Sequence, residues 1–444
     1  MSEPSDPHER ATRWRNWTGD ESCAPAAFVR PRSIDELATV LAARGSRVRA
    51  VGSGHSFSDI ACTDGTLLSL DRLAGVLDVD SSSGLVRVQG GIAINALSKR
   101  LDGHGLALEN LGDIDVQSLA GAISTGTHGT GARLANISSQ VVELKLVLAD
   151  GSTLVCSAEQ EPDVFRAARV GLGSLGVIAE ITLRCVPAFT LRGIDEPAPL
   201  AQTLARFEQL ALGNDHFEFF VFPYADVALT RTNNRTDEPP QPRGRLAAYA
   251  NDVLLTNHAF GLFCRFARRV PGAIPQVNRL VTRLAGRSER VERSASIFAS
   301  PRLVRFTEME YALPRERTPE AVRRVMELVE RRGLAVPFPI EVRTAAPDDA
   351  MLSTAAGRET GYVAVHMFAG MEWRNYFEAV EAIMCELDGR PHWGKRHFQT
   401  AATLRPRYPH WDGFQSLRAR LDPHGRFANE FTERVLGPSA GGSA

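Results

Sequence analysis

The N-terminal part of the chain alternates short apolar runs with amphipathic stretches. Between Ala26 and Pro187, short runs of β-branched and aliphatic residues are bounded by Gly, Ser and Asp, which is typical of strands. A helix is expected after Ser33, whose hydroxyl suits a helix cap, and another at 92–101. Strands are expected at 48–51, 67–70, 75–79, 85–89, 141–148 and 153–156, the last two forming a hairpin.

The pattern changes after Pro187, where the glycine-rich loops stop. The segment 247–284 carries arginines at helical spacing among apolar residues, which favours a helix across a second domain with solvated arginines; a helix on a membrane surface is the alternative. Helices are also expected at 200–212 and 376–387, and strands at 217–222, 338–344 and 362–367. The whole pattern predicts an α+β protein.

Composition narrows the class of protein. The 444 residues carry a formal net charge of -1, which gives no support for a nucleic-acid surface. No apolar run reaches the ~18 residues of a membrane span, and the polar residues 1–15 do not resemble a signal peptide. The six cysteines are scattered without metal-type spacing, so we expect free thiols in the cytoplasm and no metal site.

Two loops rich in Gly, Ser and Thr are the first candidates for chemistry. The first, Gly52-Ser53-Gly54-His55-Ser56, directly follows the expected strand 48–51. The second, Gly126-Thr127-His128-Gly129-Thr130-Gly131, lies some way along the chain. Such loops offer many backbone N–H groups with little side-chain bulk, as a pyrophosphate requires. The pair predicts a large phosphate-bearing cofactor.

A third glycine segment, 171–176, matches the letters of the dinucleotide fingerprint G-x-G-x-x-G. The fingerprint requires a strand before it and a helix after it. Here the helical stretch 163–170 comes first and the apolar run 177–186 follows. The segment therefore does not predict a nicotinamide-binding fold, and no Walker lysine follows any of these loops.

Several motifs together carry a resemblance to a known family. They are the loops 52–56 and 126–131, with the segments 173–178, 60–65, 341–343 and 389–395. This set resembles the aldonolactone oxidoreductases and the related alditol oxidases, flavoproteins of the vanillyl-alcohol-oxidase type, over about Trp14 to Gly437. The resemblance implies a two-subdomain FAD-binding domain at 14–188, an α+β substrate (cap) domain at 189–395, a C-terminal segment at 396–437 that returns to the FAD domain, and flexible ends at 1–13 and 438–444.

The resemblance also implies how the cofactor is held. The family histidine that matches His55 is often bonded to the 8α carbon of the flavin, so FAD attached through His55 is expected; some relatives hold FAD without this bond. His128 is expected to shape its loop around the FAD phosphates and to take no part in the chemistry. The implied cofactor-binding residues are Gly52, Ser53, Gly54, His55, Ser56, Gly112, Ser118, Gly121, Ser124, Gly126, Thr127, His128, Gly129, Thr130, Gly131, Gly173, Gly176, Val177, Ile178 and Lys395.

Candidate catalytic residues lie in the C-terminal half. Glu341 and Arg343 alternate along an apolar strand and therefore project from one face. By the resemblance, Arg343 stabilises charge on the substrate oxygen, Glu341 orients or deprotonates a hydroxyl, and Lys395 lies near the flavin N1. His366 and Ser118 are the further candidates by similarity to alditol oxidases, and Glu310 faces either the pocket or the surface.

The leading interpretation is an FAD-dependent oxidoreductase that transfers a hydride from a carbinol carbon to flavin N5. The expected substrate is L-gulono-1,4-lactone or a related aldonolactone, converted to the 2-keto lactone, an ascorbate precursor. An open-chain alditol is the alternative substrate, and a flavin-free sugar-binding protein is a third interpretation. The electron acceptor is O₂ or a redox protein or dye.

Overall fold

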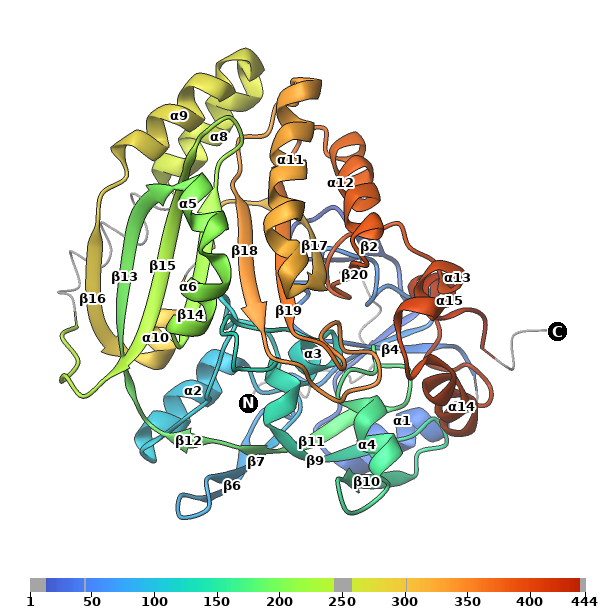
Figure 1. Cartoon of the computed structure of the whole chain (residues 1–444). Coiled ribbons are helices and arrows are strands. Elements are labelled where there is room, and N and C mark those ends of the chain that lie inside the picture. The colour runs from blue at the N-terminus through green and yellow to red at the C-terminus, as the bar shows by residue number, and fades with distance from the viewer. Residues whose placement is uncertain (1–12, 44, 243–257, 301, 440–444) are drawn as a thin grey trace, which may run out of the picture.

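The computed structural model describes residues 13–43, 45–242, 258–300 and 302–439. An N-terminal half of several small sheets occupies the lower part of Figure 1, and one large sheet with its helices stands above it. This mixture confirms the α+β class. The strands of the N-terminal half are β1 (Trp14–Arg15), β2 (Ser22–Cys23), β3 (Ala27–Val29), β4 (Val48–Val51), β5 (Thr66–Ser69), β6 (Val76–Asp80), β7 (Leu85–Gln89), β8 (Leu106–Ala107), β9 (Val141–Val147), β10 (Thr153–Ser157), β11 (Val177–Arg184) and β12 (Val186–Pro187).

Two small sheets organise the cofactor side of the molecule. A parallel sheet has the order β3-β5-β4, and a mainly antiparallel ladder has the order β10-β9-β11-β7-β6. The Ser33 hydroxyl accepts a hydrogen bond from the Glu36 amide at 3.1 Å and starts the first helix, as the sequence predicted. The predicted β9–β10 hairpin is also present. The helices of this half are α1 (Ile34–Ala42), α2 (Ile94–Gly103), α3 (Leu119–Ser124) and α4 (Pro162–Ala168).

The large sheet is built from residues between Thr190 and Pro391, and its neighbouring strands are all antiparallel. Its order is β16-β13-β15-β14-β18-β19-β17-β20. These strands are β13 (Thr190–Pro199), β14 (His216–Val221), β15 (Val227–Thr236), β16 (Ser288–Arg293), β17 (Phe306–Pro314), β18 (Ile340–Ala345), β19 (Thr360–Phe368) and β20 (Arg390–Pro391). The accompanying helices are α5 (Leu200–Ala205), α6 (Phe207–Gly213), α8 (Phe260–Arg269), α9 (Ile274–Leu284), α10 (Ser294–Phe298), α11 (Thr318–Arg332) and α12 (Arg374–Glu386).

Alternation along the central strands separates two faces of this sheet. One face is apolar and packs against α6, α11 and α12; it includes Met309, Val342 and Val365. Successive side chains of a strand point to opposite faces, so the residues between these core positions project the other way. The second face therefore carries the polar residues of β14, β17, β18 and β19, and it looks toward the N-terminal half (Figure 1).

The end of the chain returns to the N-terminal core. Helices α13 (Ala401–Leu404), α14 (Trp411–Leu421) and α15 (Glu430–Leu436) follow the last strand. Their buried residues Phe414 and Phe431 belong to one hydrophobic cluster with Leu119 and Val164 of the first half. This packing fixes the two halves around the space between them.

Two predicted helices are interrupted in the structure. The helix expected at 200–212 is divided at Arg206, whose ψ of 11° leaves the helical range, into α5 and α6. The stretch expected to be helical at 247–284 contains α8 and α9, separated at Pro271 and Gly272, because proline lacks an amide donor and glycine favours chain reversal. Residues 247–257 of that stretch lie outside the described residues, as do 1–12 and 440–444 of the expected flexible ends.

Among the residues that the structure describes, no helix combines the length and the apolar character that crossing a bilayer requires.

Candidate active site

A cavity of about 430 Å³ opens among the glycine-rich segments of the N-terminal half. It lies where β4 ends, where α3 begins and where the chain enters β11. The expected cofactor residues that line it are Gly52, Ser53, Gly54, His55, Ser56, Ser118, Gly121, Ser124, Gly173, Gly176, Val177 and Ile178. The three loop segments, distant in sequence, therefore surround one space.

The walls of this cavity fit a large polar ligand such as FAD. A Cβ at Gly52 would lie 2.2 Å from Ser118 Oγ, and one at Gly90 would lie 2.2 Å from the Ile178 carbonyl oxygen, so only glycine allows these segments to pack so closely. Ser58 Oγ and Gln117 Oε1, which belong to lining residues, are buried with no hydrogen-bond partner among the described residues. Because buried polar atoms are normally satisfied, both fit a ligand with polar groups.

His55 stands where this cavity meets a second, smaller one, and it lines both. Its ring is half-buried and stacks on Trp17, with the ring centroids 5.2 Å apart. Burial, with a smaller contribution from the charge of Lys395, lowers the pKa of His55 below its ordinary value. The imidazole is therefore neutral at neutral pH and keeps a nucleophilic nitrogen lone pair.

The loop 126–131 lies beside the smaller cavity, which Thr127 and His128 line. None of its residues lines the 430 Å³ cavity. The loop packs against the large sheet instead: the Gly131 amide donates to the Thr344 carbonyl at 2.9 Å, and the Thr130 carbonyl contacts His216 Nδ1 at 2.8 Å. A Cβ at Gly129 would lie 2.2 Å from the Leu111 carbonyl oxygen. The glycines of this loop thus allow backbone to pack closely on backbone. A loop that serves this purpose is as rich in glycine as a phosphate-binding loop, so composition does not distinguish the two.

Two further expected residues, Gly112 and Ser118, differ in position. Gly112 packs beside this loop, where an added Cβ would lie 3.3 Å from the His128 carbonyl oxygen. Ser118 lines the cofactor cavity and not the smaller one, so the structure does not bring it to the other catalytic candidates. Its hydroxyl accepts from the Gly121 amide at 3.4 Å and caps α3.

The smaller cavity, of about 60 Å³, is lined by charged side chains of both halves. Three acids and three bases face it: Asp113, Glu308, Glu310, Arg302, Arg343 and Lys395. The pairing register of the strands explains why several of these side chains lie together. Glu308 lies opposite His366, and both Glu310 and Glu341 lie opposite Ala364, so these residues share the polar face of β17, β18 and β19.

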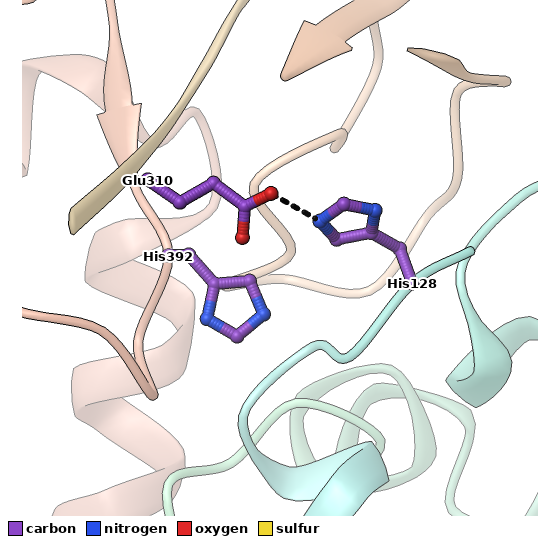
Figure 2. Close-up of side chains that lie close together, drawn as sticks. All are labelled: His128, Glu310 and His392. Atoms are coloured by element: carbon purple, nitrogen blue, oxygen red, sulfur yellow. Dashed lines mark ion pairs between the residues drawn. The ribbon is translucent and has the colours of Figure 1, made fainter. Parts of the chain in front are cut away.

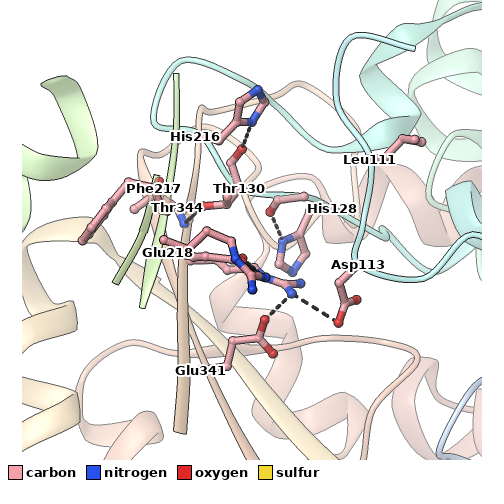
Figure 3. A network of polar contacts seen from close by, with 12 residues as sticks. Leu111, Asp113, His128, Thr130, His216, Phe217, Glu218, Glu341 and Thr344 are labelled. Atoms are coloured by element: carbon pink, nitrogen blue, oxygen red, sulfur yellow. Dashed lines mark hydrogen bonds and ion pairs between the residues drawn. The ribbon is translucent and has the colours of Figure 1, made fainter. Parts of the chain in front are cut away.

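Arg343 is the centre of a buried ionic network with Glu341, Glu218 and Asp113, and Figure 3 labels these three acids. Its guanidinium contacts Glu341 and is 3.0 Å from Glu218 Oε2 and 3.4 Å from Asp113 Oδ2. Burial opposes the charge on Arg343, but the three carboxylates outweigh it and raise the pKa of Arg343 well above the ordinary value. The cation is therefore permanently charged and rigidly held at the cavity wall.

Glu341 differs from Arg343 in that its surroundings disfavour its charged form. Burial raises the pKa of Glu341 to about 7, with further raising by Asp113 and Glu218, while Arg343 lowers it. The side chain is buried and does not itself line the cavity; it reaches the cavity through its contact with Arg343. A carboxylate with a pKa close to neutral is suited to accept and release a proton under physiological conditions.

Lys395 and His366 share one carboxylate, Glu308. The Lys395 ammonium forms an ion pair with Glu308 and lies 4.9 Å from the centre of the Phe57 ring. His366 Nε2 is 3.6 Å from Glu308 and 3.8 Å from Glu341, while its Nδ1 contacts the Pro339 carbonyl at 3.0 Å. His366 does not line the cavity, so the structure places it behind the carboxylates rather than against a substrate.

A second cluster contains His128, Glu310 and His392 (Figure 2). His128 Nε2 is 3.3 Å from Glu310, and its Nδ1 is 2.8 Å from the Gly129 carbonyl, so both ring nitrogens face acceptors. The Gly394 amide donates to His392 Nδ1 at 3.0 Å, and burial lowers the pKa of His392 to about 3. The neutral ring then carries its proton on Nε2 and has no free lone pair for a metal, so the cluster is suited to hydrogen bonding and not to metal binding.

The structure adds residues that sequence reasoning missed. Glu308 was detectable in principle, because it alternates with Glu310 along an apolar strand, as Glu341 does with Arg343. Glu310 itself, which was left open, is buried and lines the cavity. No sequence signal distinguishes Asp113, Arg302 or Glu218, since their roles arise only from contacts between distant segments.

Comparisons with known proteins agree with this geometry. A family model described as D-arabinono-1,4-lactone oxidase matches residues 181–435, and one described as FAD binding domain matches residues 25–157. The chain is 55% identical over 428 residues to an L-gulono-1,4-lactone dehydrogenase of Mycobacterium tuberculosis, covering 96% of this chain and 99% of that protein. It is 34% identical over 455 residues to an alditol oxidase of a Streptomyces species, again covering 96% and 99%.

The fold comparison gives a more distant relative. A solved structure titled solvent-stable cholesterol oxidase matches with a TM-score of 0.80 at 19% identity, covering 98% of this chain and 100% of that one. This likeness shows the fold, the vanillyl-alcohol-oxidase type of flavoprotein. With the family matches across both halves of the chain, it confirms the resemblance drawn from the motifs: the chain belongs to the FAD-dependent aldonolactone oxidoreductases.

Proposed function

We propose that the protein oxidises L-gulono-1,4-lactone, or a closely related aldonolactone, to the 2-keto lactone that precedes ascorbate. The observation that carries the proposal is the charged cavity beside the cofactor cavity. Its three carboxylates and three cations balance in charge and supply both hydrogen-bond acceptors and donors, which suits a neutral polyhydroxylated substrate better than an anion. The name of the relative that is 55% identical, an L-gulono-1,4-lactone dehydrogenase, supports the same substrate.

The roles of the residues follow from their contacts. When bound, FAD accepts a hydride at its N5 atom. Arg343 donates hydrogen bonds to the substrate oxygen and stabilises the negative charge that grows there as its proton leaves. Glu341, which lies behind the cavity wall against the same guanidinium, takes up that proton through one bridging water. Lys395, fixed by Glu308, keeps a positive charge at the cofactor side of the cavity.

His55 is proposed as the covalent anchor of FAD. The support is its place at the junction of the two cavities and its neutral, nucleophilic imidazole. We further place the enzyme in the cytoplasm, because all six cysteines are free thiols, which suits a reducing compartment. The electron acceptor is O₂ or a redox protein.

An open-chain alditol is the second candidate substrate. His366, a candidate by similarity to alditol oxidases, is buried beside Glu308 and Glu341 on the polar face of the sheet. The 34% identity to an alditol oxidase supports the same alternative. A linear polyol carries adjacent hydroxyl groups, as an aldonolactone does, but lacks the lactone ring and its carbonyl.

A substrate panel tests the proposed function. Purified holoenzyme is assayed with L-gulono-1,4-lactone, D-arabinono-1,4-lactone, xylitol and sorbitol, with O₂ and with an artificial electron acceptor in parallel. We expect kcat/KM for the lactones to exceed that for the alditols by at least about tenfold, since one well-placed polar contact contributes about 1.4 kcal/mol or more. Preference for the alditols would transfer the assignment to the second candidate, and inactivity on all four would contradict both.

The raised pKa of Glu341 predicts the pH dependence of the reaction. Glu341 accepts a proton only when ionised, so kcat/KM for the lactone should fall below pH about 7, by about tenfold per pH unit. In Glu341→Gln this acidic limb should disappear and the plateau should drop by about 10²–10⁴-fold, the usual contribution of a general base. An unchanged acidic limb in this variant would assign the titration to another group.

A further inference from the structure

Helices α8 and α9 form a hairpin, residues 260–284, at the outer end of the large sheet (Figure 1). Of the nine large apolar side chains that are exposed among the described residues, five belong to this short segment. Leu284 is 75% exposed and Leu262 62%, although most leucines of the chain are buried. The five residues are Leu262, Phe266, Val270, Leu280 and Leu284.

The exposed residues follow the helical repeat. On α8, Leu262 and Phe266 share the outer face with Arg265 and Arg269, while Cys264 and Ala267 face inward. On α9, the outer face carries Leu280 and Leu284 together with Arg279 and Arg283, while Ile274, Asn278 and Thr282 are buried. Each helix therefore presents leucine or phenylalanine and arginine on the same side.

The charge of the hairpin contrasts with that of the whole chain. Between His258 and Ser288 the sequence contains six arginines and no acidic residue, whereas the formal net charge of the protein is -1. All six arginines are exposed. Arg265, Arg269 and Arg283 form no ion pair with a carboxylate that the structure describes. The described part of this surface thus combines exposed positive charge with protruding apolar side chains.

We propose that the α8–α9 hairpin docks the protein on an anionic lipid surface. Exposed leucine and phenylalanine side chains enter the boundary between headgroups and acyl chains, and arginines bury their stems while their guanidinium groups reach lipid phosphates. Charge complementarity selects this occupant. Arg287 pairs with Glu196 and Glu289, but a zwitterionic bilayer or a neutral apolar partner would supply no counter-charge for Arg265, Arg269 and Arg283. The association is peripheral, with the helices lying in the plane of the interface.

The hairpin is connected to the active site through aromatic packing. Phe260, at the start of α8, contacts Phe338 with ring centroids 4.8 Å apart, and Phe338 contacts Phe306 at 5.4 Å. Phe306 in turn lines the charged cavity. The hairpin is therefore separated from the wall of the catalytic cavity by one aromatic ring, that of Phe338, and docking brings that cavity close to the membrane.

Vesicle flotation of the holoenzyme tests the proposal independently of catalysis. Vesicles of phosphatidylcholine alone are compared with vesicles containing phosphatidylglycerol at low salt. We expect binding to the anionic vesicles to be at least about tenfold stronger, because each interfacial arginine contributes about fivefold to the affinity. Binding should weaken as salt is added.

Three variants make the test specific. The variant L262Q/F266Q/L280Q/L284Q should lose flotation, and R265Q/R269Q/R283Q should lose the preference for anionic lipid. The matched control L77Q/L212Q, which replaces exposed leucines elsewhere, should bind like the wild type. Retained lactone oxidation in solution shows that each variant is folded.

Two results would overturn the proposal. The first is equal flotation of the wild type and the apolar variant. The second is no flotation of the wild type on anionic vesicles. A dimeric mass that the apolar variant reduces to that of a monomer would then make the hairpin an interface between two copies of the chain.

Discussion

Replacing Arg343 by methionine is expected to lower kcat/KM for L-gulono-1,4-lactone by about 10²–10³-fold or more, the usual cost of removing one donor to a developing oxyanion. The guanidinium lines the catalytic cavity and is held by Glu341, Glu218 and Asp113. Methionine preserves much of the side-chain volume but cannot donate a hydrogen bond. Steady-state kinetics, normalised to bound flavin by absorbance near 450 nm, measures the loss.

A control must separate catalysis from stability, because the substitution leaves three carboxylates without their shared cation. Breaking a buried ion pair costs about 3–5 kcal/mol of folding free energy. Arg231→Met is the matched control, since Arg231 also pairs with Glu218, at 3.1 Å, but does not line the charged cavity. We expect both variants to lower the Tm and only Arg343→Met to lower kcat/KM strongly. Similar losses of activity would mean that Arg343 acts mainly through folding.

Replacing His55 by alanine is expected to abolish covalent attachment of FAD. Acid precipitation of the wild type should leave flavin fluorescence in the protein pellet, whereas precipitation of His55→Ala should release all of it into the supernatant. The physical reason is that the neutral imidazole of His55, stacked on Trp17, lies at the junction of the two cavities and supplies the nucleophile. No other described histidine lines both cavities.

Ser56→Ala is the control for this experiment. It alters the same loop and the same cavity wall but keeps the imidazole, so its flavin should remain in the pellet. Flavin released from the wild type would contradict the covalent bond while leaving FAD binding intact. Absence of flavin from both fractions of the wild type would contradict the cofactor itself.

Local sequence patterns predicted much of this molecule. The period-two alternation of Glu341 and Arg343 placed both on one strand face, and the structure joins them in an ion pair. The glycines at 52–54 and 173–176 do line one cavity, as their composition suggested. These predictions hold because alternation and backbone freedom are properties of a few neighbouring residues.

Other features depend on contacts that no local pattern contains. Arg343 meets Glu218 because β14 pairs with β18, and it meets Asp113 because a loop of the first half closes over the sheet. The glycines of 126–131 show a related limit: composition does not reveal whether a backbone approaches a ligand or another backbone. These contacts between distant segments form only when the two halves assemble, so the sequence of one segment cannot show them.

The two-faced central sheet has a consequence for how such an enzyme diversifies. Along β17, β18 and β19, core residues such as Met309, Val342 and Val365 alternate with residues of the polar face. Selection on substrate preference can therefore act on every second position, such as Ala364 between Glu310 and Glu341, while the intervening positions preserve the fold. A one-residue insertion in these strands would exchange the two sets of side chains and destroy both at once. These strands thus tolerate substitutions at the polar-face positions but do not tolerate insertions or deletions.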